Sequence, residues 1–257
     1  MIDLHCHLLP GVDDGSRSVT QSVEVLTHLA SLGVTGICLT PHLLASQAVE
    51  GVPAAHDSAF ESLRPAIPPG IRVYRGAEVM LDRPLSAVVA RDRAVTLNRS
   101  RYLLIEFPRL VAAQTVEHAL ALVAAIGLVP LVAHPERYRV CQVSSVERWR
   151  SLGALMQVDG PTLLSPKPRG ERARELIAHG LADIIAGDNH GDQRSLAEAR
   201  AALFDQGGAM QAELLTVRNP GAILADQPVQ PVEPFTWRLS FLERMRALLL
   251  GDRGDRS

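Results

Sequence analysis

His5 and His7, near the start of the chain, have the spacing with which a β-strand presents two ligands to one metal ion. Side chains two residues apart in a strand point to the same face, roughly 6.5 to 7 Å apart. Two imidazoles on one face can bind one ion from one side. Asp13 and Asp14 follow in an acidic turn, and spacing alone leaves open which of them is a further ligand. The opening stretch therefore predicts part of a metal site.

Strand-like apolar runs alternate with helical patterns along the whole chain. We expect strands at residues 2–7, 36–40, 71–77, 102–105, 129–133, 154–158 and 183–186. We expect helices near residues 19–30, 58–66, 84–90, 115–126, 145–151, 168–179, 195–204 and 209–217, and a loop at 44–58. Mostly apolar strands alternating with helices indicate a parallel sheet buried on both faces, either open and doubly wound or closed. Seven units without a glycine-rich phosphate turn favour a closed barrel.

Most of the expected strands end in residues of metal-ligand type. These residues are His5, His7, His42, Glu78, Glu106, His134, Asp188 and His190. Chemistry in such barrels lies at the carboxyl ends of the strands, so a shared rim favours one site. With Asp14 the set holds five histidines and four carboxylates, too many for one ion and suited to three when one carboxylate bridges. Imidazole and carboxylate without thiolate suit Zn²⁺, Mn²⁺ or Fe.

The charge of such a centre favours an anionic substrate. Four carboxylates offset only four of the roughly six positive charges on three divalent ions, so the pocket would bind a phosphate dianion. The whole chain has a formal net charge of −2, which gives no reason to expect a nucleic-acid partner.

Composition places the chain among ordinary globular proteins. Its 257 residues, 47% hydrophobic and 21% charged, fit one large α/β domain as well as two small ones. Three widely separated cysteines indicate a reducing compartment. The sequence shows no signal peptide and no apolar run long enough for a transmembrane segment. We therefore expect a cytoplasmic protein.

Several longer motifs resemble one protein family. They are M-I-D-L-H-C-H-L-L-P-G-V-D-D-G at 1–15, T-P-H at 40–42, G-A-E at 76–78, Y-L-L-I-E-F-P at 102–108, A-H-P-E-R at 133–137, G-D-N-H at 187–190 and N-P-x-x-I-L at 219–224. They resemble the PHP (polymerase and histidinol phosphatase) superfamily, and within it the bacterial protein-tyrosine phosphatases of the CpsB/YwqE/CapC type from capsule and exopolysaccharide loci. The chain departs from the family at 187–190, where Ser-Asp-Ala-His is more usual.

The resemblance implies a distorted (β/α)₇ barrel of the PHP type with three divalent ions at the C-terminal rim of the strands. Mn²⁺ is the expected ion, with Fe or Zn²⁺ as alternatives. By motif position, one ion is held by His5, His7, Glu78 and Asp188. A second is held by bridging Glu78 with Glu106 and His134, and a third by Asp14, His42 and His190. Asp14 is thereby favoured over Asp13, and Arg137 and Arg194 are implied to bind the phosphoryl group.

The resemblance also implies a metal-dependent protein-tyrosine phosphatase in which a metal-bound hydroxide attacks phosphorus. Its expected substrate is the phosphotyrosine tail of a bacterial tyrosine autokinase that drives polysaccharide synthesis. Two alternatives are a small-molecule PHP phosphoesterase of the histidinol-phosphate or nucleotide type, and a non-catalytic kinase-docking module. Glu106 argues against the first, because other PHP branches tend to carry histidine there, and the intact ligand set argues against the second. The oligomeric state stays open between a monomer and a homo-oligomer.

The cysteines offer no other route to phosphate release. The cysteine-dependent route needs Cys-x₅-Arg, but the residues six positions after the three cysteines are Val12, Leu44 and Glu147. The sequence also has no G-x-S-x-G elbow and no P-loop.

The C-terminal part differs in composition from the rest. We expect the barrel to span residues 1–225 and a proline-rich linker to span 226–234. An amphipathic helix is expected at 235–250, packed on its own domain or on a second subunit, with a membrane-surface helix as the minority alternative. Residues 251–257 are expected to form a disordered tail.

Overall fold

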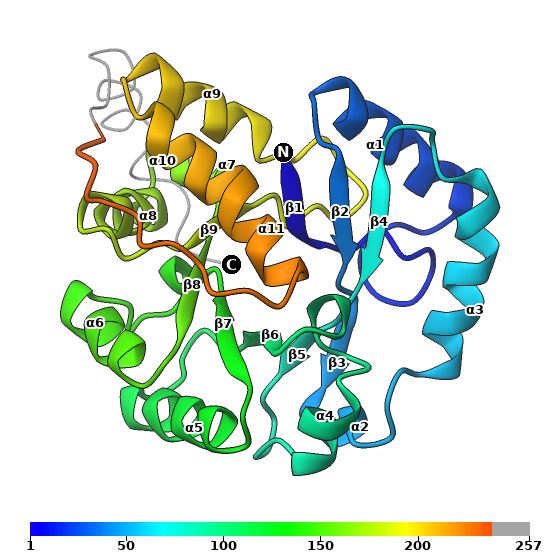
Figure 1. The fold of residues 1–257 in the computed structure, drawn as a ribbon, viewed down its shortest axis with the longest axis horizontal. Helices are drawn as coiled ribbons and strands as arrows, with labels where there is room; N and C mark the ends of the chain where they lie inside the picture. The colour runs from blue at the N-terminus through cyan, green and yellow to red at the C-terminus, as the bar shows by residue number, and fades with distance from the viewer. Residues whose placement is uncertain (238–257) are drawn as a thin grey trace.

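Parallel strands form the centre of the fold, and helices surround them (Figure 1). The computed structural model describes residues 1–237. Its strands are β1 (Ile2–Cys6), β2 (Gly36–Leu39), β3 (His42–Leu44), β4 (Arg72–Arg75), β5 (Glu78–Met80), β6 (Tyr102–Glu106), β7 (Val129–Ala133), β8 (Leu155–Asp159) and β9 (Ile184–Ala186). Within the described residues they form two sheets, of order β1-β2-β4 and β3-β5-β6-β7-β8-β9.

The two sheets join into one ring because two extended segments each contribute a strand to both sheets. The chain runs from β2 into β3 through two residues, and from β4 into β5 through two residues. Backbone hydrogen bonds continue across the breaks, from Gly76 N to Leu39 O at 2.9 Å and from Glu78 N to Pro41 O at 3.1 Å. Pro41 has no N–H to donate to a ladder, which explains a break at that point.

The ring closes between β1 and the segment after β9. An isolated parallel bridge pairs Cys6 with Asn189, and Asp188 N donates to His5 O at 3.0 Å. The buried Asp3 carboxylate also accepts from Gly187 N at 3.0 Å. The fold is therefore the distorted (β/α)₇ barrel that was expected, with the expected strands 36–40 and 71–77 continued by the separate strands β3 and β5.

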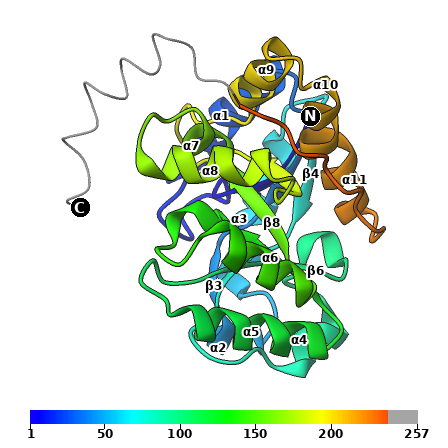
Figure 2. The same ribbon diagram turned by 90° about the vertical axis from the view of Figure 1, so that its left-hand side faces the viewer.

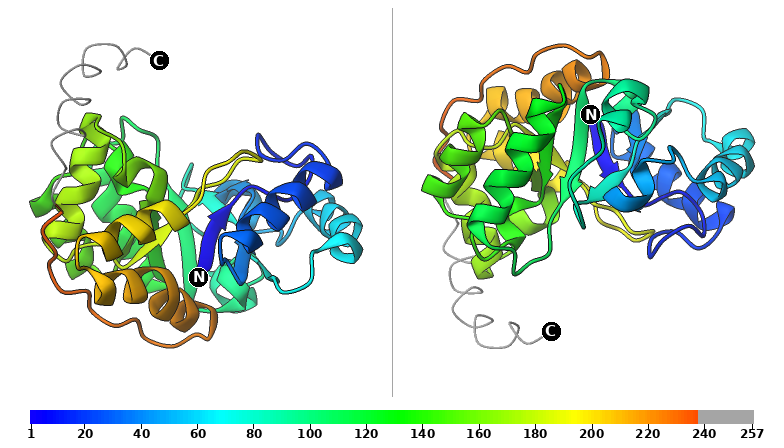
Figure 3. Two further views of the ribbon diagram at one scale, coloured as in Figure 1. Left: turned by 90° about the horizontal axis from the view of Figure 1, so that it is seen from above. Right: turned by 90° about the horizontal axis from the view of Figure 1, so that it is seen from below.

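Helices cover the outside of the barrel. They are α1 (Val19–Ser31), α2 (Ala45–Ala48), α3 (Ala54–Leu63), α4 (Ala87–Asp92), α5 (Ala113–Ala125), α6 (Val143–Ser151), α7 (Gly160–Leu163), α8 (Pro168–Ala178), α9 (Ala197–Asp205), α10 (Ala209–Glu213) and α11 (Asn219–Leu224). Figure 2 shows α5, α6 and α8 stacked along one side, and Figure 3 shows α1 and α3 on the opposite side of the strands from α8. The prediction of a loop over 44–58 was wrong, because its short helices of small and polar residues show no clear hydrophobic period.

Strand alternation sorts side chains between two apolar layers. Leu103 and Ile105 of β6 belong to the cluster between the barrel and its helices. Leu104 between them joins a second cluster with Leu4 and Leu131, from β1 and β7. Successive side chains of a strand point to opposite faces, so this second cluster fills the barrel interior. The barrel interior is therefore a packed apolar core.

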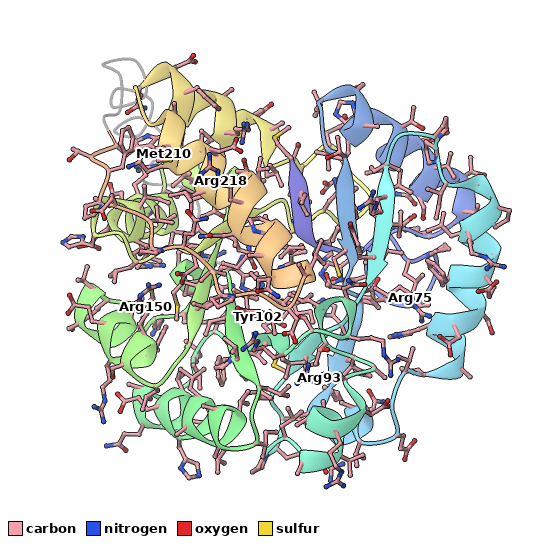
Figure 4. The ribbon with its side chains drawn as sticks, viewed as in Figure 1. Arg75, Arg93, Tyr102, Arg150, Met210 and Arg218 are labelled. Atoms are coloured by element: carbon pink, nitrogen blue, oxygen red, sulfur yellow. The ribbon has the colours of Figure 1, made fainter. Side chains whose placement is uncertain are left out.

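Residues 226–237 have no regular structure but lie against the barrel. The Tyr102 hydroxyl donates to Gln227 O at 2.7 Å, and Arg93 pairs with Asp226 at 3.2 Å; Tyr102 and Arg93 are labelled in Figure 4. Phe235 N donates to Ile177 O at 3.2 Å. From residue 238 onward, the expected C-terminal helix lies outside the described residues, as does the expected tail. In residues 1–237 no helix has the length and apolar character needed to cross a membrane.

Candidate metal centre

All nine predicted ligands lie together at the C-terminal rim of the barrel. Their donor atoms form four groups that share members, and within each group the atoms lie within 4.8 Å of one another. The groups are His5, His7 and Asp188; His5, Glu78 and His134; His42, Glu78 and Glu106; and His7, Asp14, His42 and His190. Because the groups share residues, they form one continuous cluster rather than four separate sites.

The most deeply buried part of the cluster has donor spacings that fit a metal ion. His5 Nε2 and His7 Nε2 lie 3.2 Å apart. Glu78 Oε2 lies 3.3 and 3.4 Å from these two nitrogens, and Asp188 Oδ1 lies 3.3 and 3.5 Å from them. A tetrahedron with bonds of about 2.1 Å has edges of about 3.4 Å. His5, His7 and Asp188 thus form one group whose spacing fits a divalent ion, and Glu78 Oε2 lies close to both of its imidazoles.

Glu78 connects this part of the cluster to the next. Its Oε1 lies 3.0 Å from His134 Nε2, and its Oε2 lies 3.0 Å from His42 Nδ1. Glu106 stands further out, with Oε1 3.7 Å from His134 Nε2 and Oε2 4.0 Å from His42 Nδ1. A carboxylate whose two oxygens face different sets of nitrogens is placed to bridge two ions.

The outer part of the cluster faces solvent. Asp14 Oδ1 lies 3.4 Å from both His42 Nε2 and His190 Nε2. The Asp14 side chain is 69% exposed, whereas the His5 and Glu78 side chains are buried. This part is therefore the accessible side of the centre.

Asp13 faces away from this outer part and holds His7. Asp13 Oδ2 lies 2.8 Å from His7 Nδ1, and the carboxylate also accepts from His42 N at 3.1 Å and Gly15 N at 3.0 Å. Burial acts to raise the pKa of Asp13, but the hydrogen bond and charge of His7 lower it to about 2. An ionised Asp13 keeps the proton of the imidazole on Nδ1 and leaves Nε2 to face the cluster. Sequence spacing could not separate these roles of Asp13 and Asp14.

Gln157 is a supporting residue that the sequence analysis missed. Its Oε1 lies 2.9 Å from His5 Nδ1 and accepts from His134 N at 3.3 Å. It therefore orients His5 as Asp13 orients His7. The available signal was a buried amide in the apolar strand β8, since buried polar side chains in strands need a specific partner.

Two proposed ligands occupy strained backbone positions. His134 has φ of 31° and Asp188 has φ of 46°, which are left-handed values that few non-glycine residues adopt. His134 directly follows β7, and Asp188 follows β9 after one intervening residue, Gly187. Strain of this kind persists where the surroundings require it, and it is concentrated at functional sites.

The buried carboxylates of the cluster are suited to binding cations. Burial acts to lower the pKa of His5, yet the Glu78 and Asp188 carboxylates raise it to about 9. Burial and Glu78 raise the pKa of Glu106 to about 7. Glu78 Oε2 and Asp188 Oδ1 are buried and have no hydrogen-bond donor among the described residues. Orphaned carboxylate oxygens facing imidazole nitrogens fit divalent metal ions.

Two arginines, Arg137 and Arg194, approach the cluster on the side of Asp188. Arg137 Nη2 donates to Asp188 Oδ2, and to Asp159 Oδ2 at 3.1 Å. Burial acts to lower the pKa of Arg137, but these two carboxylates raise it further above its usual range. Arg194 Nη1 is 3.9 Å from Asp188 Oδ2, while its Nε donates to Asp192 at 2.7 Å. Arg137 is thus the more firmly placed of the two cations.

Asp13→Asn should weaken metal binding about 10- to 100-fold, the usual cost of losing a partner that orients a ligand. The new amide can donate to His7 Nδ1, which would move the imidazole proton to Nε2 and block it as a ligand. Elemental analysis and competition with a chelating dye measure the effect. Asp205→Asn, at an exposed position of α9, is the matched control. Wild-type affinity in Asp13→Asn would show that this carboxylate does not orient His7.

The barrel and its histidine–carboxylate rim define a metal-dependent barrel enzyme of the PHP type. The model of the family described as "Capsular polysaccharide synthesis, CpsB/CapC" matches residues 1–225. The chain therefore belongs to the CpsB/CapC family.

Individual relatives can be aligned with this chain along nearly their whole length. The tyrosine-protein phosphatase CpsB of Streptococcus pneumoniae is 28% identical over 88% of this chain and 99% of its own. The tyrosine-protein phosphatase YwqE of Bacillus subtilis is 27% identical over 94% of this chain and 99% of its own. A structure reported for these two proteins, described as metal-dependent tyrosine phosphatases, superimposes with a TM-score of 0.77 at 25% identity, covering 93% of this chain and all of the other.

Proposed function

We propose that this chain is a metal-dependent tyrosine-protein phosphatase that acts in capsular polysaccharide synthesis. The observation that carries the proposal is Glu78, whose two oxygens face different histidines at the centre of the rim. A bridged polynuclear site suits attack on a phosphate ester, and the family and its relatives supply the substrate class.

We assign three divalent ions to the cluster. His5, His7, Glu78 and Asp188 would hold the first, Glu78, Glu106 and His134 the second, and Asp14, His42 and His190 the third. Mn²⁺ is the proposed ion, with Fe or Zn²⁺ as alternatives for the same imidazole and carboxylate donors. When bound, such ions lower the pKa of coordinated water and offset charge on phosphoryl oxygens.

The protein's own groups orient the reaction. Asp13 and Gln157 hold His7 and His5 with their Nε2 atoms toward the centre. Arg137 would donate to phosphoryl oxygens as charge develops on them, with Arg194 assisting from the more exposed side. The leaving phenolate of tyrosine has an ordinary pKa of about 10, so it needs less protonation than an alkoxide.

The proposed substrate is the phosphotyrosine tail of a bacterial tyrosine autokinase in the cytoplasm. Asp14 and His42 supply the accessible side of the cluster, where a flexible phosphorylated segment can enter. A tail of this kind has no fold to disrupt when it extends into the site, and it loses conformational entropy only on binding.

Phosphate release by metal-stripped and reloaded protein tests the function. We expect chelated protein to lose phosphotyrosine-peptide hydrolysis and to regain it with Mn²⁺, Fe²⁺ or Zn²⁺. Full activity after stripping would refute the proposal. Faster turnover of histidinol phosphate than of phosphotyrosine peptide would instead favour the small-molecule phosphoesterase. Tight peptide binding without phosphate release would favour a docking module.

Metal affinity should rise with pH up to about 9. The pKa of His5 is about 9 in the metal-free protein, so below that pH an ion must displace a proton from its imidazole. Burial acts to lower the pKa of His7, but its hydrogen bond to Asp13 raises this pKa well above its usual value, so apparent affinity should weaken at least about tenfold for each unit by which the pH falls. Dye-competition titrations at pH 6.5 and 7.5 measure the slope. An affinity independent of pH in this range would contradict the raised pKa.

A further inference from the structure

Two apolar side chains continue the strand faces that carry the ligands His42 and Glu78. Leu44 follows His42 by two residues in β3, and Met80 follows Glu78 by two residues in β5. Residues at i and i+2 of a strand share one face. The intervening Leu43 and Val79 are buried in the outer core, toward the helices. Leu44 and Met80 therefore lie on the barrel-axis face, one step further toward solvent than the ligands.

These two side chains are neighbours and form one patch. The parallel register pairs Leu44 with Met80, and Met80 in turn with Glu106 of β6. Leu44 is 41% exposed and Met80 is half-buried. We call Leu44 and Met80 the rim patch.

The loops behind the rim patch are tied together. Ser46 N donates to Asp82 Oδ1 at 2.9 Å, and Arg83 Nη2 donates to Ser46 O at 2.7 Å. Leu81 N donates to Glu106 O at 3.1 Å. The rim patch is thus presented by anchored backbone, which lowers the cost of ordering it against a ligand.

We propose that the rim patch binds the aromatic ring of the substrate's phosphotyrosine while the cluster binds its phosphoryl group. This inference rests on the proposed function and names its specificity determinant. The step from His42 to Leu44 along the strand is about 6.6 Å, which matches the length scale of a phenyl ring attached to a phosphoryl group. An apolar side chain at that distance favours an aryl ester over a polar alkyl phosphate by removing ring surface from water.

Leu44→Ala and Met80→Ala should each raise KM for phenyl phosphate and for a phosphotyrosine peptide about tenfold, with kcat little changed. Inhibition by inorganic phosphate should stay within about twofold of wild type, because phosphate has no ring to contact the patch. Leu44→Met and Met80→Leu should restore KM, since they keep apolar volume. Leu32→Ala is the matched control, because Leu32 is 38% exposed at the end of α1, away from the rim.

The outcomes separate the inference from the function on which it rests. Wild-type protein loaded with Mn²⁺ that releases no phosphate from either aryl ester would refute the proposed function. Active wild type with unchanged KM in both alanine variants would refute the rim patch alone. An effect on the peptide but not on phenyl phosphate would assign the patch to flanking residues and overturn the ring contact. A parallel change in phosphate inhibition and metal content would indicate a structural role and would also overturn it.

Discussion

Glu78→Gln should abolish phosphatase activity, lowering kcat/KM for a phosphotyrosine peptide by at least about 10³-fold. Glu78 is buried, and both of its oxygens lie 3.0 Å from histidine nitrogens, those of His134 and His42. Glutamine keeps the volume but removes the negative charge and one acceptor, so it cannot bridge two ions. We therefore expect the bound metal to fall by more than one ion per chain, measured by elemental analysis beside the kinetics.

The exposed carboxylate of Glu24 on α1 provides the control for this variant. Glu24→Gln changes the net charge by the same amount and should retain wild-type activity and metal content. Activity of Glu78→Gln within about tenfold of wild type would exclude Glu78 as a bridging ligand. Loss of only one ion per chain would confine Glu78 to a single metal position.

Gly15→Ala should destabilise the protein by about 3 kcal/mol or more and remove bound metal at the same time. A Cβ at Gly15 would lie 2.0 Å from His7 O and 2.4 Å from His7 Cβ. Neither atom is the end of a flexible side chain, so the backbone of the ligand strand itself must move. Ser16 N also donates to His7 O at 2.8 Å, so this movement breaks a hydrogen bond.

Urea unfolding of metal-loaded and metal-free protein measures both effects of Gly15→Ala. The control is Gly221→Ala, whose Cβ would only touch Ile2 Cδ1 at 3.6 Å. Because Gly221 lies within α11, alanine there should be neutral or stabilise by up to about 1 kcal/mol. A stable Gly15→Ala protein with its full metal content would show that the 7–16 turn can accommodate a Cβ at this position.

The types of the ligands and their common rim followed from the sequence. Strand–helix alternation is a local hydrophobic pattern, and parallel strands of a barrel place their carboxyl ends at one rim. His42, Glu106 and His134 could therefore be assigned to one cluster from the sequence alone. Motif resemblance supplied the family and, with it, the expected partition among ions.

Other features depended on contacts between distant segments, which no local pattern encodes. The break after β2 follows from Pro41 within the folded ring, and β3 is too short to give a periodic signal. Asp13 and Asp14 are adjacent and chemically identical, and only the path of the turn directs Asp13 to His7 and Asp14 to the outer histidines.

The opening strand shows which features of the site could be predicted from the sequence and which could not. Alternation placed His5 and His7 on one face, because the geometry of a strand repeats every two residues. Which nitrogen of each imidazole faces the cluster was decided by hydrogen bonds to Asp13 and to Gln157, the latter 152 positions away from His5 along the chain. Residue type and spacing thus determined which groups could bind metal. Only the tertiary structure decided how they are oriented and shared, since orientation depends on partners that the closed barrel brings together.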